Sequence, residues 1–390
     1  MKITDVKTFN VYTYRTNYVF VKIETDEGVS GIGEGTLEFK ENALVGAVED
    51  IKRVLLGRDP REIERLCFEL YRDSYWREGP ALQSAISAVN IALWDLKAKL
   101  YNLPVYELLG GRFRDSVRMY ANAWFVGAKK PEDFAAAAKE AVAKGITALK
   151  WDPFGSAYQY MSNAEFSRSM EVVEAVRGAV GSDVDLLIEC HGRFDIATSI
   201  KIAHALKSFN PMFFEEPTPP DSLDALAEVR RKSPIPVAAG ERIYSVAQFK
   251  TFLEKGCADF AQPDISHCGG ISAIMKMAAM AEPYYVAIAP HNPSGPVANA
   301  ATLQMAATLP GFRILEICLT DVSWRSELTN EKVVFDKGNI LIPEGIGIGV
   351  ELNEENCLKY PFQPTNLHHY TGALTNTRPP NQTSTYFIGI

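Results

Sequence analysis

The chain has 390 residues, of which 47% are hydrophobic and 23% charged, and its formal net charge is −8. This composition supplies enough apolar material for a large buried core, in one big domain or two ordinary ones. The charge is acidic without a basic stripe, and no apolar run approaches the roughly 18 residues of a membrane span, which argues against nucleic-acid binding and against a membrane protein.

The cysteines and the N-terminus bear on the cellular compartment. The six cysteines are scattered and form no C-x-x-C pair, which is typical of reduced, mostly buried thiols. The first residues, MKITDVKTFNVYTY, contain no long apolar run after the basic residue and so lack the pattern of a signal peptide. We therefore expect a cytoplasmic protein.

Residues 1–115 are expected to form a small α+β domain. Residues 2–35 contain alternating and β-branched runs typical of strands, and the glycines of TDEGVSGIGEG suit a hairpin turn and a bulge. The pattern then changes to apolar residues at helical spacing. The last helix should begin after Pro80 and end near Asn102, because Pro104 follows as a stop signal. The helical segments are 41–57, 60–76 and 81–102.

From about residue 117 a different rhythm begins. Short apolar runs recur about every 25–35 residues, and each is followed by a helical pattern. Roughly eight such units predict a (β/α)8-type barrel, a modified TIM barrel, over residues 116–334. A doubly wound open sheet is the structural alternative, but it would normally use fewer strands. The runs are VRMYANA, ITALKWD, VDLLIEC, PMFFEEP, PVAAGE, ADFAQPD, YVAIAPH and FRILEIC.

The chain returns to turn-rich β segments near its C-terminus. The run NEKVVFDKGNILIPEGIGIGVEL has the alternation and glycines of short strands. We expect the segment 335–390 to pack back on the N-terminal domain. The tail from about Gln363 is polar and rich in Pro, Thr and Asn, which predicts an extended arm or disorder, with His368 and His369 solvated.

Polar side chains end nearly every predicted barrel strand. In barrels of this kind, the C-terminal ends of the strands carry the active site. A structural protein has no need of such a pattern, because unpaired buried charge is costly. The strand-end residues are Lys150, Asp152, Glu189, His191, Glu215, Glu216, Glu241, Asp264, His291 and Glu316.

Three successive strands end in glutamates: Glu189, then Glu215 or Glu216, then Glu241. Three carboxylates converging on one point repel each other without a cation, and oxygen ligands suit a hard ion, Mg2+ before Mn2+. Because Glu215 and Glu216 are adjacent, they point to opposite sides of the strand, and only one should face the metal. The alternative is that each glutamate caps a neighbouring helix or pairs with a nearby arginine.

Two histidines accompany these carboxylates. His191 lies two residues after Glu189 and projects from the same face, while His291 and Asp264 end neighbouring strands. A carboxylate bonded to one ring nitrogen fixes the tautomer and raises the basicity of the other nitrogen. Two histidines across a bound substrate can divide the base and acid roles. The histidines that we interpret instead as satisfied structural residues are His204 and His267.

Such a site suits one chemical problem. A proton α to a carboxylate is very weakly acidic, and a divalent cation can stabilise the enediolate that forms when the proton leaves. The metal, with Lys150, would supply electrostatic stabilisation where charge develops. The pattern therefore predicts an enzyme that abstracts a proton next to a substrate carboxylate.

Several runs together carry a family resemblance that extends to about Glu351. They include DEGVSGIGEG, SAISAVNIALWDLKAKLYNLPVYELLGG, CHGRFD, FFEEP, AAGER, QPDISHCGGI and APHNPSGP. In these runs the chain resembles the mandelate racemase subgroup of the enolase superfamily, and within it the galactonate dehydratase type of acid-sugar dehydratase. The resemblance implies a barrel with an N-terminal α+β capping domain.

The resemblance also implies roles for the strand-end residues. His291 would be the general base with Asp264 as its partner, and His191 would be the acid that protonates the departing 3-hydroxyl. The product would be a 2-keto-3-deoxy acid after the enol tautomerises. The metal ligands implied are Glu189, Glu215 and Glu241.

Substrate contacts are implied in the same way. Lys150 resembles the first lysine of the K-x-K of racemases and would contact the carboxylate, and Glu316 would bond a substrate or enolate oxygen. The capping domain would enclose the substrate with Tyr18, Trp76 and Arg77. We count Asp152 among the substrate-binding candidates with these residues.

Two positions depart from the family pattern. Asp152 stands at the third position of the K-x-K, so a second base is missing, which argues against racemisation and for elimination. Glu189 stands where aspartate is usual in the galactonate enzymes, and the extra methylene shifts the carboxylate.

The function expected is that of a Mg2+-dependent dehydratase, a lyase acting on an aldonate such as galactonate, gluconate or arabinonate. A racemase, epimerase or cycloisomerase using the same enolate chemistry is the first alternative, and a non-catalytic barrel with a structural metal is the second. No H-x-H ends the first strand, which argues against a metal-dependent hydrolase. We also expect a homo-oligomer.

Overall fold

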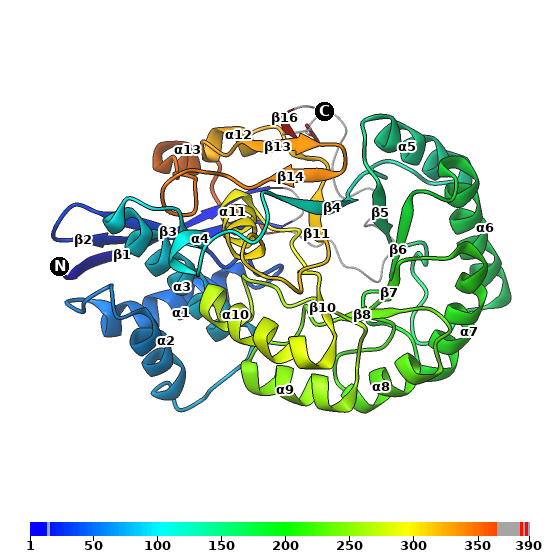
Figure 1. Cartoon of the computed structure of the whole chain (residues 1–390), viewed down its shortest axis with the longest axis horizontal. Helices are drawn as coiled ribbons and strands as arrows, with labels where there is room; N and C mark the ends of the chain where they lie inside the picture. The colour runs from blue at the N-terminus through cyan, green and yellow to red at the C-terminus, as the bar shows by residue number, and fades with distance from the viewer. Residues whose placement is uncertain (14–15, 365–382, 385–386, 389–390) are drawn as a thin grey trace.

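The computed structural model describes residues 1–13, 16–364, 383–384 and 387–388. Within these residues, the N-terminal part folds as three antiparallel strands followed by three long helices on one side of the molecule (Figure 1). Gly28 takes a φ of +79° in the turn between the second and third strands, in agreement with the predicted hairpin. The elements are β1 (Ile3–Val11), β2 (Tyr18–Thr25), β3 (Ser30–Glu34), α1 (Glu41–Leu55), α2 (Ile63–Arg72) and α3 (Pro80–Tyr101).

The glycines of the predicted bulge have a different role. The strands β2 and β3 pair in continuous register, so the bulge prediction is wrong. Gly31 and Gly33 face helix α3, where an added Cβ would overlap the carbonyl oxygens of Ala92 and Ala88. The missing side chains let α3 lie directly on the sheet. Alternating glycines form the same sequence pattern whether they produce a bulge in a strand or allow a helix to pack closely on it.

The middle of the chain forms a closed barrel. Among the described residues, eight parallel strands follow one another in chain order from β4 to β11, and β11 pairs with β4. A parallel bridge between Ile288 of the seventh strand and Phe312, three residues before β11, closes the ring on this side. Each predicted run overlaps one of these strands, which confirms the barrel and excludes the open sheet. The strands are β4 (Ser116–Asn122), β5 (Ala148–Trp151), β6 (Asp185–Glu189), β7 (Phe213–Glu215), β8 (Val237–Ala239), β9 (Phe260–Ala261), β10 (Ala287–Ile288) and β11 (Leu315–Cys318).

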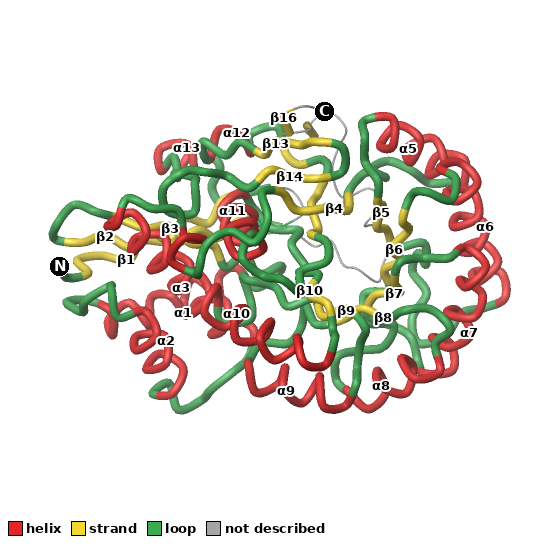
Figure 2. Tube along the Cα trace, in the orientation of Figure 1, coloured by secondary structure: helices red, strands yellow, loops and turns green. Residues whose placement is uncertain are grey.

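Helices surround this ring of strands (Figure 2). In the described chain, the segment between β11 and the next hairpin contains only one helix, α12 (Arg325–Leu328), of four residues, so the last unit of the barrel is modified. A short helix, α4 (Val105–Leu108), leads into the barrel, and two 3-10 turns, η1 (Lys207–Phe209) and η2 (Glu282–Tyr284), end longer helices. The helices between the strands are α5 (Pro131–Ala143), α6 (Asn163–Val180), α7 (Ile196–Leu206), α8 (Leu223–Lys232), α9 (Val246–Lys255), α10 (Gly270–Ala281) and α11 (Pro296–Ala306).

The segment after the barrel divides between the two parts of the molecule. β13 (Val333–Asp336) and β14 (Asn339–Leu341) form a hairpin, and β14 pairs antiparallel with β4 of the barrel. Further on, α13 (Glu354–Lys359) contacts β1, and Pro361 forms a bridge with Val11. The hairpin therefore extends the barrel sheet, and only the later part of the segment lies on the N-terminal domain.

Two short strands of the tail fall within the described residues. β15 (Thr383–Ser384) pairs antiparallel with β12 (Asp321–Val322), and β16 (Phe387–Ile388) pairs in parallel with β13. At these residues the tail is an extended arm. His368 and His369 lie outside the described residues.

Side chains fill the barrel below its mouth. Tyr120, Leu187 and Phe213 point into the ring and are fully buried. The barrel interior is thus a packed core, and the polar strand ends lie above it. In the described part of the chain, no helix combines the length and the apolarity needed to cross a membrane.

Candidate active site

The polar side chains that end the barrel strands meet at one mouth. Glu189 and Glu215 are paired residues of the neighbouring strands β6 and β7, and Glu241 follows the end of β8 by two residues. His191 lies beyond the third strand of the barrel and His291 beyond the seventh. In the ring of eight described strands, the two histidines therefore stand on opposite walls.

Three glutamates form a dense group of possible metal ligands. One carboxylate oxygen from each of Glu189, Glu215 and Glu241 lies within 4.8 Å of the others. Glu189 and Glu215 are buried, whereas Glu241 is partly exposed. Glu216 pairs with Arg242 instead. Of the two adjacent glutamates, Glu215 is the one that faces this group.

The electrostatics of the group favour a cation. Burial and the neighbouring Glu189 carboxylate raise the pKa of Glu215 well above its ordinary value. The Oε2 atom of Glu215 is buried and has no hydrogen-bond partner among the described residues. A hard divalent ion would supply that partner and neutralise the repulsion. A donor set of carboxylate oxygens alone fits Mg2+ better than a soft metal.

Lys150 is the cation that the chain itself brings to the mouth. Its Nζ lies 2.8 Å from Glu215, 2.9 Å from Glu316 and 3.2 Å from Glu189. The same atom lies 5.4 Å from the centre of the Tyr120 ring. Although burial opposes the charge, Glu215 and Glu316 raise the pKa of Lys150 well above its ordinary value. Lys150 therefore stays protonated, and its single charge faces three carboxylates.

His291 is held by a buried carboxylate on one wall. Its Nδ1 lies 2.7 Å from Oδ2 of Asp264, and its Nε2 lies 3.2 Å from Glu241. Although burial opposes the charge, Glu241 and Glu316 raise the pKa of His291. Against burial, His267 and His291 lower the pKa of Asp264. Because Nδ1 of His291 is bonded to Asp264, Nε2 is the ring nitrogen that faces the glutamates.

His191 is held in the same way on the opposite wall. Its Nδ1 lies 2.7 Å from Oδ2 of Asp152, and the buried Arg193 donates to the same oxygen. Oδ1 of Asp152 accepts the backbone N–H of Phe154 at 2.8 Å. Asp152 therefore holds His191, and its assignment as a substrate-binding residue stays a prediction. His191 and Gly192 both have positive φ angles, 52° and 61°, so a left-handed turn aims the imidazole.

A cavity of about 290 Å3 lies over these groups. Lys150, Glu189, Glu316 and both histidines line it from the barrel, and residues 36–40 line it from the N-terminal domain with Thr16 and Pro80. The size and the polar lining suit a small polar molecule, with the reactive groups below and the capping domain above.

The capping residues expected to enclose substrate lie elsewhere. Trp76 is 83% exposed, and neither Trp76 nor Arg77 is among the described residues that line the cavity. Tyr18 is buried, and its hydroxyl accepts a hydrogen bond from Arg325 at 3.2 Å. The roof is instead the loop at 36–40, which sequence analysis missed because a loop carries no periodic pattern.

Two further cavity residues were missed for different reasons. Asn122 ends β4, and its Nδ2 donates to Oε1 of Glu316 at 2.8 Å. Its place at the end of the first barrel strand is a signal that sequence analysis could have used. His267, interpreted as structural, lines the cavity with its Nε2 3.7 Å from Asp264. The sequence signal for His267 was its position three residues after Asp264, in the same turn.

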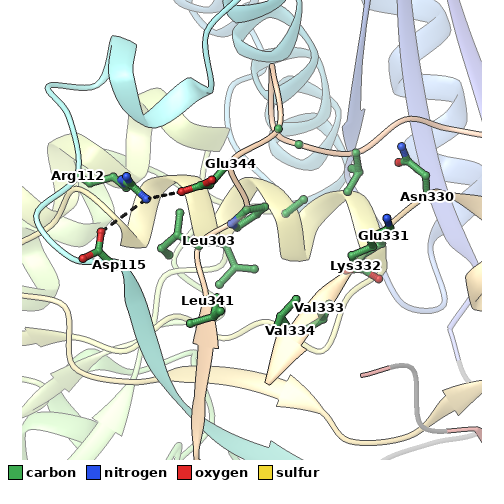
Figure 3. Close-up of a pocket in the computed structure, with 16 residues that line it drawn as sticks. Arg112, Asp115, Leu303, Asn330, Glu331, Lys332, Val333, Val334, Leu341 and Glu344 are labelled. Carbon is green, nitrogen blue, oxygen red and sulfur yellow. Dashed lines mark hydrogen bonds and ion pairs between the residues drawn. The ribbon is translucent and has the colours of Figure 1, made fainter. Parts of the chain in front are cut away.

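A larger cavity of about 770 Å3 lies away from the mouth, beside β13, β14 and α11 (Figure 3). On its wall, Arg112 lies 3.3 Å from Glu344 and 3.6 Å from Asp115. Leu303 and Leu341 form apolar parts of its lining. In the described chain, the group of three possible metal ligands is at the barrel mouth and not here. The mouth is therefore the candidate active site.

A second group of buried carboxylates lies between the N-terminal domain and the barrel. This interdomain cluster consists of Glu34, Asp321 and Glu331 around Arg325. Arg325 lies 2.9 Å from Asp321 and 3.1 Å from Glu331. Glu34 accepts two backbone N–H groups at the start of α11, at 2.7 and 2.8 Å. Each carboxylate of this cluster thus has donors within the described chain.

Two family models match the chain. The mandelate racemase/muconate lactonizing enzyme N-terminal domain matches residues 6–110, and the enolase C-terminal domain-like model matches residues 133–356. The chain is 38% identical over 352 residues to a protein named D-gluconate dehydratase from Thermoproteus tenax, which covers 90% of this chain and 71% of that protein. It is 36% identical over 371 residues to a D-galactonate dehydratase from Variovorax paradoxus, which covers 93% and 95%.

Solved structures agree with this similarity. A member of the enolase superfamily from Salmonella typhimurium superposes with a TM-score of 0.88 at 32% identity, covering 92% of this chain and 98% of that chain. A mandelate racemase/muconate lactonizing enzyme-like protein from Roseovarius superposes with a TM-score of 0.89 at 32% identity, covering 94% and 97%.

Proposed function

Because the chain belongs to the mandelate racemase/muconate lactonizing enzyme family of the enolase superfamily, we propose that it is a Mg2+-dependent lyase that removes water from a sugar acid. The substrate is an aldonate such as galactonate, gluconate or arabinonate, and the product is a 2-keto-3-deoxy acid. The relatives named D-gluconate and D-galactonate dehydratase support this substrate class. The observation that carries the proposal is the pair of carboxylate-held histidines on opposite walls, across three glutamates.

Glu189, Glu215 and Glu241 would hold the Mg2+. The ion would stabilise the negative charge that develops on the substrate carboxylate when the α-proton leaves. Lys150, kept protonated by its carboxylate neighbours, attracts the same end of the substrate. Glu316 contacts a substrate oxygen beside it. The longer side chain of Glu189 is compatible with this scheme, because its oxygen still converges with those of the other two glutamates.

His291 removes the α-proton through Nε2. Asp264, bonded to Nδ1, keeps the tautomer in which Nε2 is the acceptor, and it stabilises the imidazolium that forms. The electron pair of the broken C–H bond moves toward the substrate carboxylate. The proton stays on His291 until solvent takes it.

His191 gives a proton to the 3-hydroxyl, which leaves as water. Asp152 holds Nδ1 of His191, and Arg193 in turn holds Asp152, so the Nε2 edge of the ring is kept toward the cavity. Because the two histidines stand on opposite walls, the proton and the hydroxyl leave from opposite faces of the substrate. The resulting enol tautomerises to the 2-keto-3-deoxy acid.

The racemase alternative needs a second base on the wall opposite His291. Asp152 occupies the position where racemases of this family carry the second lysine of the K-x-K. Its carboxylate is engaged by His191 and Arg193. This arrangement favours elimination over racemisation.

The test is a screen of aldonates with Mg2+ for a 2-keto-3-deoxy product.

His291→Ala should slow both product formation and exchange of the α-proton with solvent deuterium by about a hundred- to ten-thousand-fold. His191→Ala should still exchange the α-proton but lose little water. The control is His204→Ala, since His204 is exposed on α7 and away from the mouth. Turnover by His291→Ala at the wild-type rate would contradict the base assignment, and α-exchange without water loss in the wild type would favour the isomerase.

A further inference from the structure

Helix α3 of the N-terminal domain presents a buried polar stripe to the barrel loop that follows β9. Ser84, Ser87 and Asn90 are spaced three residues apart on one face of the helix and are fully buried. Ser84 Oγ lies 2.9 Å from Nδ1 of His267. Ser87 Oγ accepts the N–H of Gly269 at 2.8 Å, and Asn90 accepts a backbone N–H of α10 at 3.1 Å. The N-terminal domain thus holds the loop that carries Asp264 and His267.

His267 stands at the cavity end of this stripe. Its side chain is 13% exposed and lines the cavity over the barrel mouth. Since Nδ1 faces Ser84, the opposite edge of the ring carries Nε2, which lies 3.7 Å from Oδ2 of Asp264. That distance is too long for a hydrogen bond.

The carboxylate beside His267 already has other partners. Asp264 Oδ2 is bonded to His291 at 2.7 Å, and Oδ1 accepts the N–H of Ser266 at 2.7 Å. His267 has one nitrogen bonded to a helix of the capping domain and the other at the cavity wall.

We propose that His267 is a substrate-binding residue that recognises one hydroxyl of the sugar acid, and that Ser84 positions its ring from the N-terminal domain. This inference rests on the proposed function. An imidazole nitrogen can donate to or accept from a hydroxyl, and the directions of the hydroxyls distinguish epimeric sugar acids. Because His267 adjoins Asp264, the recognised hydroxyl lies on the wall of the cavity that carries the base.

Two replacements of His267 separate the roles of its ring nitrogens. Asparagine places an amide near the position of Nδ1 and keeps a partner for Ser84, whereas glutamine reaches the position of Nε2. We expect His267→Asn to raise KM for the preferred acid about three- to ten-fold, the effect of one lost hydrogen bond, with little change in kcat. His267→Gln should retain most of the affinity. For the deoxy acid that lacks the recognised hydroxyl, the wild type and His267→Asn should have equal KM values.

Ser84→Ala and Ser87→Ala form a matched pair. Each removes one buried hydroxyl of α3 that bonds the barrel loop, but only Ser84 touches His267. Both should lower the thermal midpoint by similar amounts, and only Ser84→Ala should raise KM, by about three-fold. His204→Asn, on the exposed face of α7, is the control for the His267 replacements.

Three results would overturn the inference. The first is a wild-type KM for every acid in His267→Asn. The second is an equal rise in KM for Ser84→Ala and Ser87→Ala. The third is a fall in kcat alone in His267→Asn, which would mean that His267 holds Asp264. In each case the wild type still dehydrates its acid. If the wild type neither turns over any aldonate nor binds one by calorimetry with Mg2+, the proposed function fails and this inference fails with it.

Discussion

Lys150 at the barrel mouth and Arg325 between the two domains each face several buried carboxylates. In the interdomain cluster, Glu34 accepts backbone N–H groups at the start of α11, and Arg325 pairs with the two other carboxylates. The mouth cluster, which consists of Glu189, Glu215 and Glu316 around Lys150 together with Glu241, is less complete. There, Glu215 Oε2 is buried without a donor in the described chain.

A buried acid is therefore not by itself a sign of function. In the interdomain cluster, satisfied carboxylates join β3 to α11, which is a structural role. In the mouth cluster, carboxylates of like charge are held close together with one partner missing, and this suits a group that must still bind a cation and a substrate. Changes of the same kind should therefore have opposite effects in the two places.

The largest contrast is expected from one Glu→Gln change in each cluster. Glu241→Gln should slow turnover about a thousand-fold, because a metal ligand loses its charge. Without Mg2+ it should lower the free energy of unfolding by less than Glu34→Gln does, because it removes repulsion among the glutamates as well as the contact with His291. Glu34→Gln should preserve turnover but cost about 1–3 kcal/mol of stability, because its amide would face a backbone N–H. Turnover assays and guanidinium unfolding measure the two effects in each variant. Equal losses of stability in Glu241→Gln and Glu34→Gln would contradict the expected difference between the clusters.

Removing the central cation should also separate the clusters. Arg325→Met leaves buried carboxylates unpaired and should cost about 3–5 kcal/mol in the free energy of unfolding. Lys150→Met should lower the free energy of unfolding by less with Mg2+ than without it, because the ion also neutralises the glutamates that Lys150 faces. Urea unfolding with Mg2+ and with EDTA measures the difference. An Arg325→Met protein as stable as the wild type would show that the interdomain cluster is not structural.

Metal addition should act on the mouth cluster alone. With Mg2+ at one hundred times its Kd, the wild type should gain about 2.7 kcal/mol of stability. Glu241→Gln should lose most of this gain, and Glu34→Gln should keep it. Thermal unfolding across a Mg2+ titration gives the values, and a gain retained in Glu241→Gln would remove Glu241 from the ligand set.

The smallest expected effect is a pH dependence of the interdomain cluster. Burial raises the pKa of Glu331 to about 7, despite the nearby Arg325. The folded protein therefore holds this proton more tightly than the unfolded chain. The contribution of Glu331 to stability is full below the pKa of the unfolded chain and falls as pH rises to about 7, by about 3 kcal/mol at most.

Glu331→Gln should remove this slope, so its free energy of unfolding should depend less on pH than that of the wild type between pH 4.5 and 7. Glu355→Gln is the control, because Glu355 is 87% exposed. An unchanged slope in Glu331→Gln would mean that the carboxylate is ionised throughout this range in the folded protein.

Much of the fold was predictable from local pattern. The eight apolar runs predicted the eight strands because a strand buried on both faces needs a continuous apolar segment, and the helices between them show in the spacing of apolar residues. The bulge prediction failed because the reason for Gly31 and Gly33 lies in helix α3, far along the chain. The place of the hairpin β13–β14 was likewise decided by its pairing with β4.

The candidate site was predictable where chain order alone sets position. The ends of parallel strands meet at one mouth, so Glu189, Glu215 and Glu241 could be grouped in advance. The sequence could not show that Trp76 lies outside the cavity, because nothing local sets the direction of a loop side chain. His267 was missed for a related reason, since its partner Ser84 belongs to the other domain.

Local pattern was enough to predict the barrel, the order of its strands and the residue types at its mouth, because these follow from the period of apolar residues and from what ends each strand. The carboxylate partners of the two histidines depend instead on the three-dimensional fold. Asp152 lies 39 residues before His191 and Asp264 lies 27 residues before His291, yet each pair is 2.7 Å apart. Hydrogen bonds act over a few ångströms in space, and the closing of the barrel alone brings such distant residues within that range.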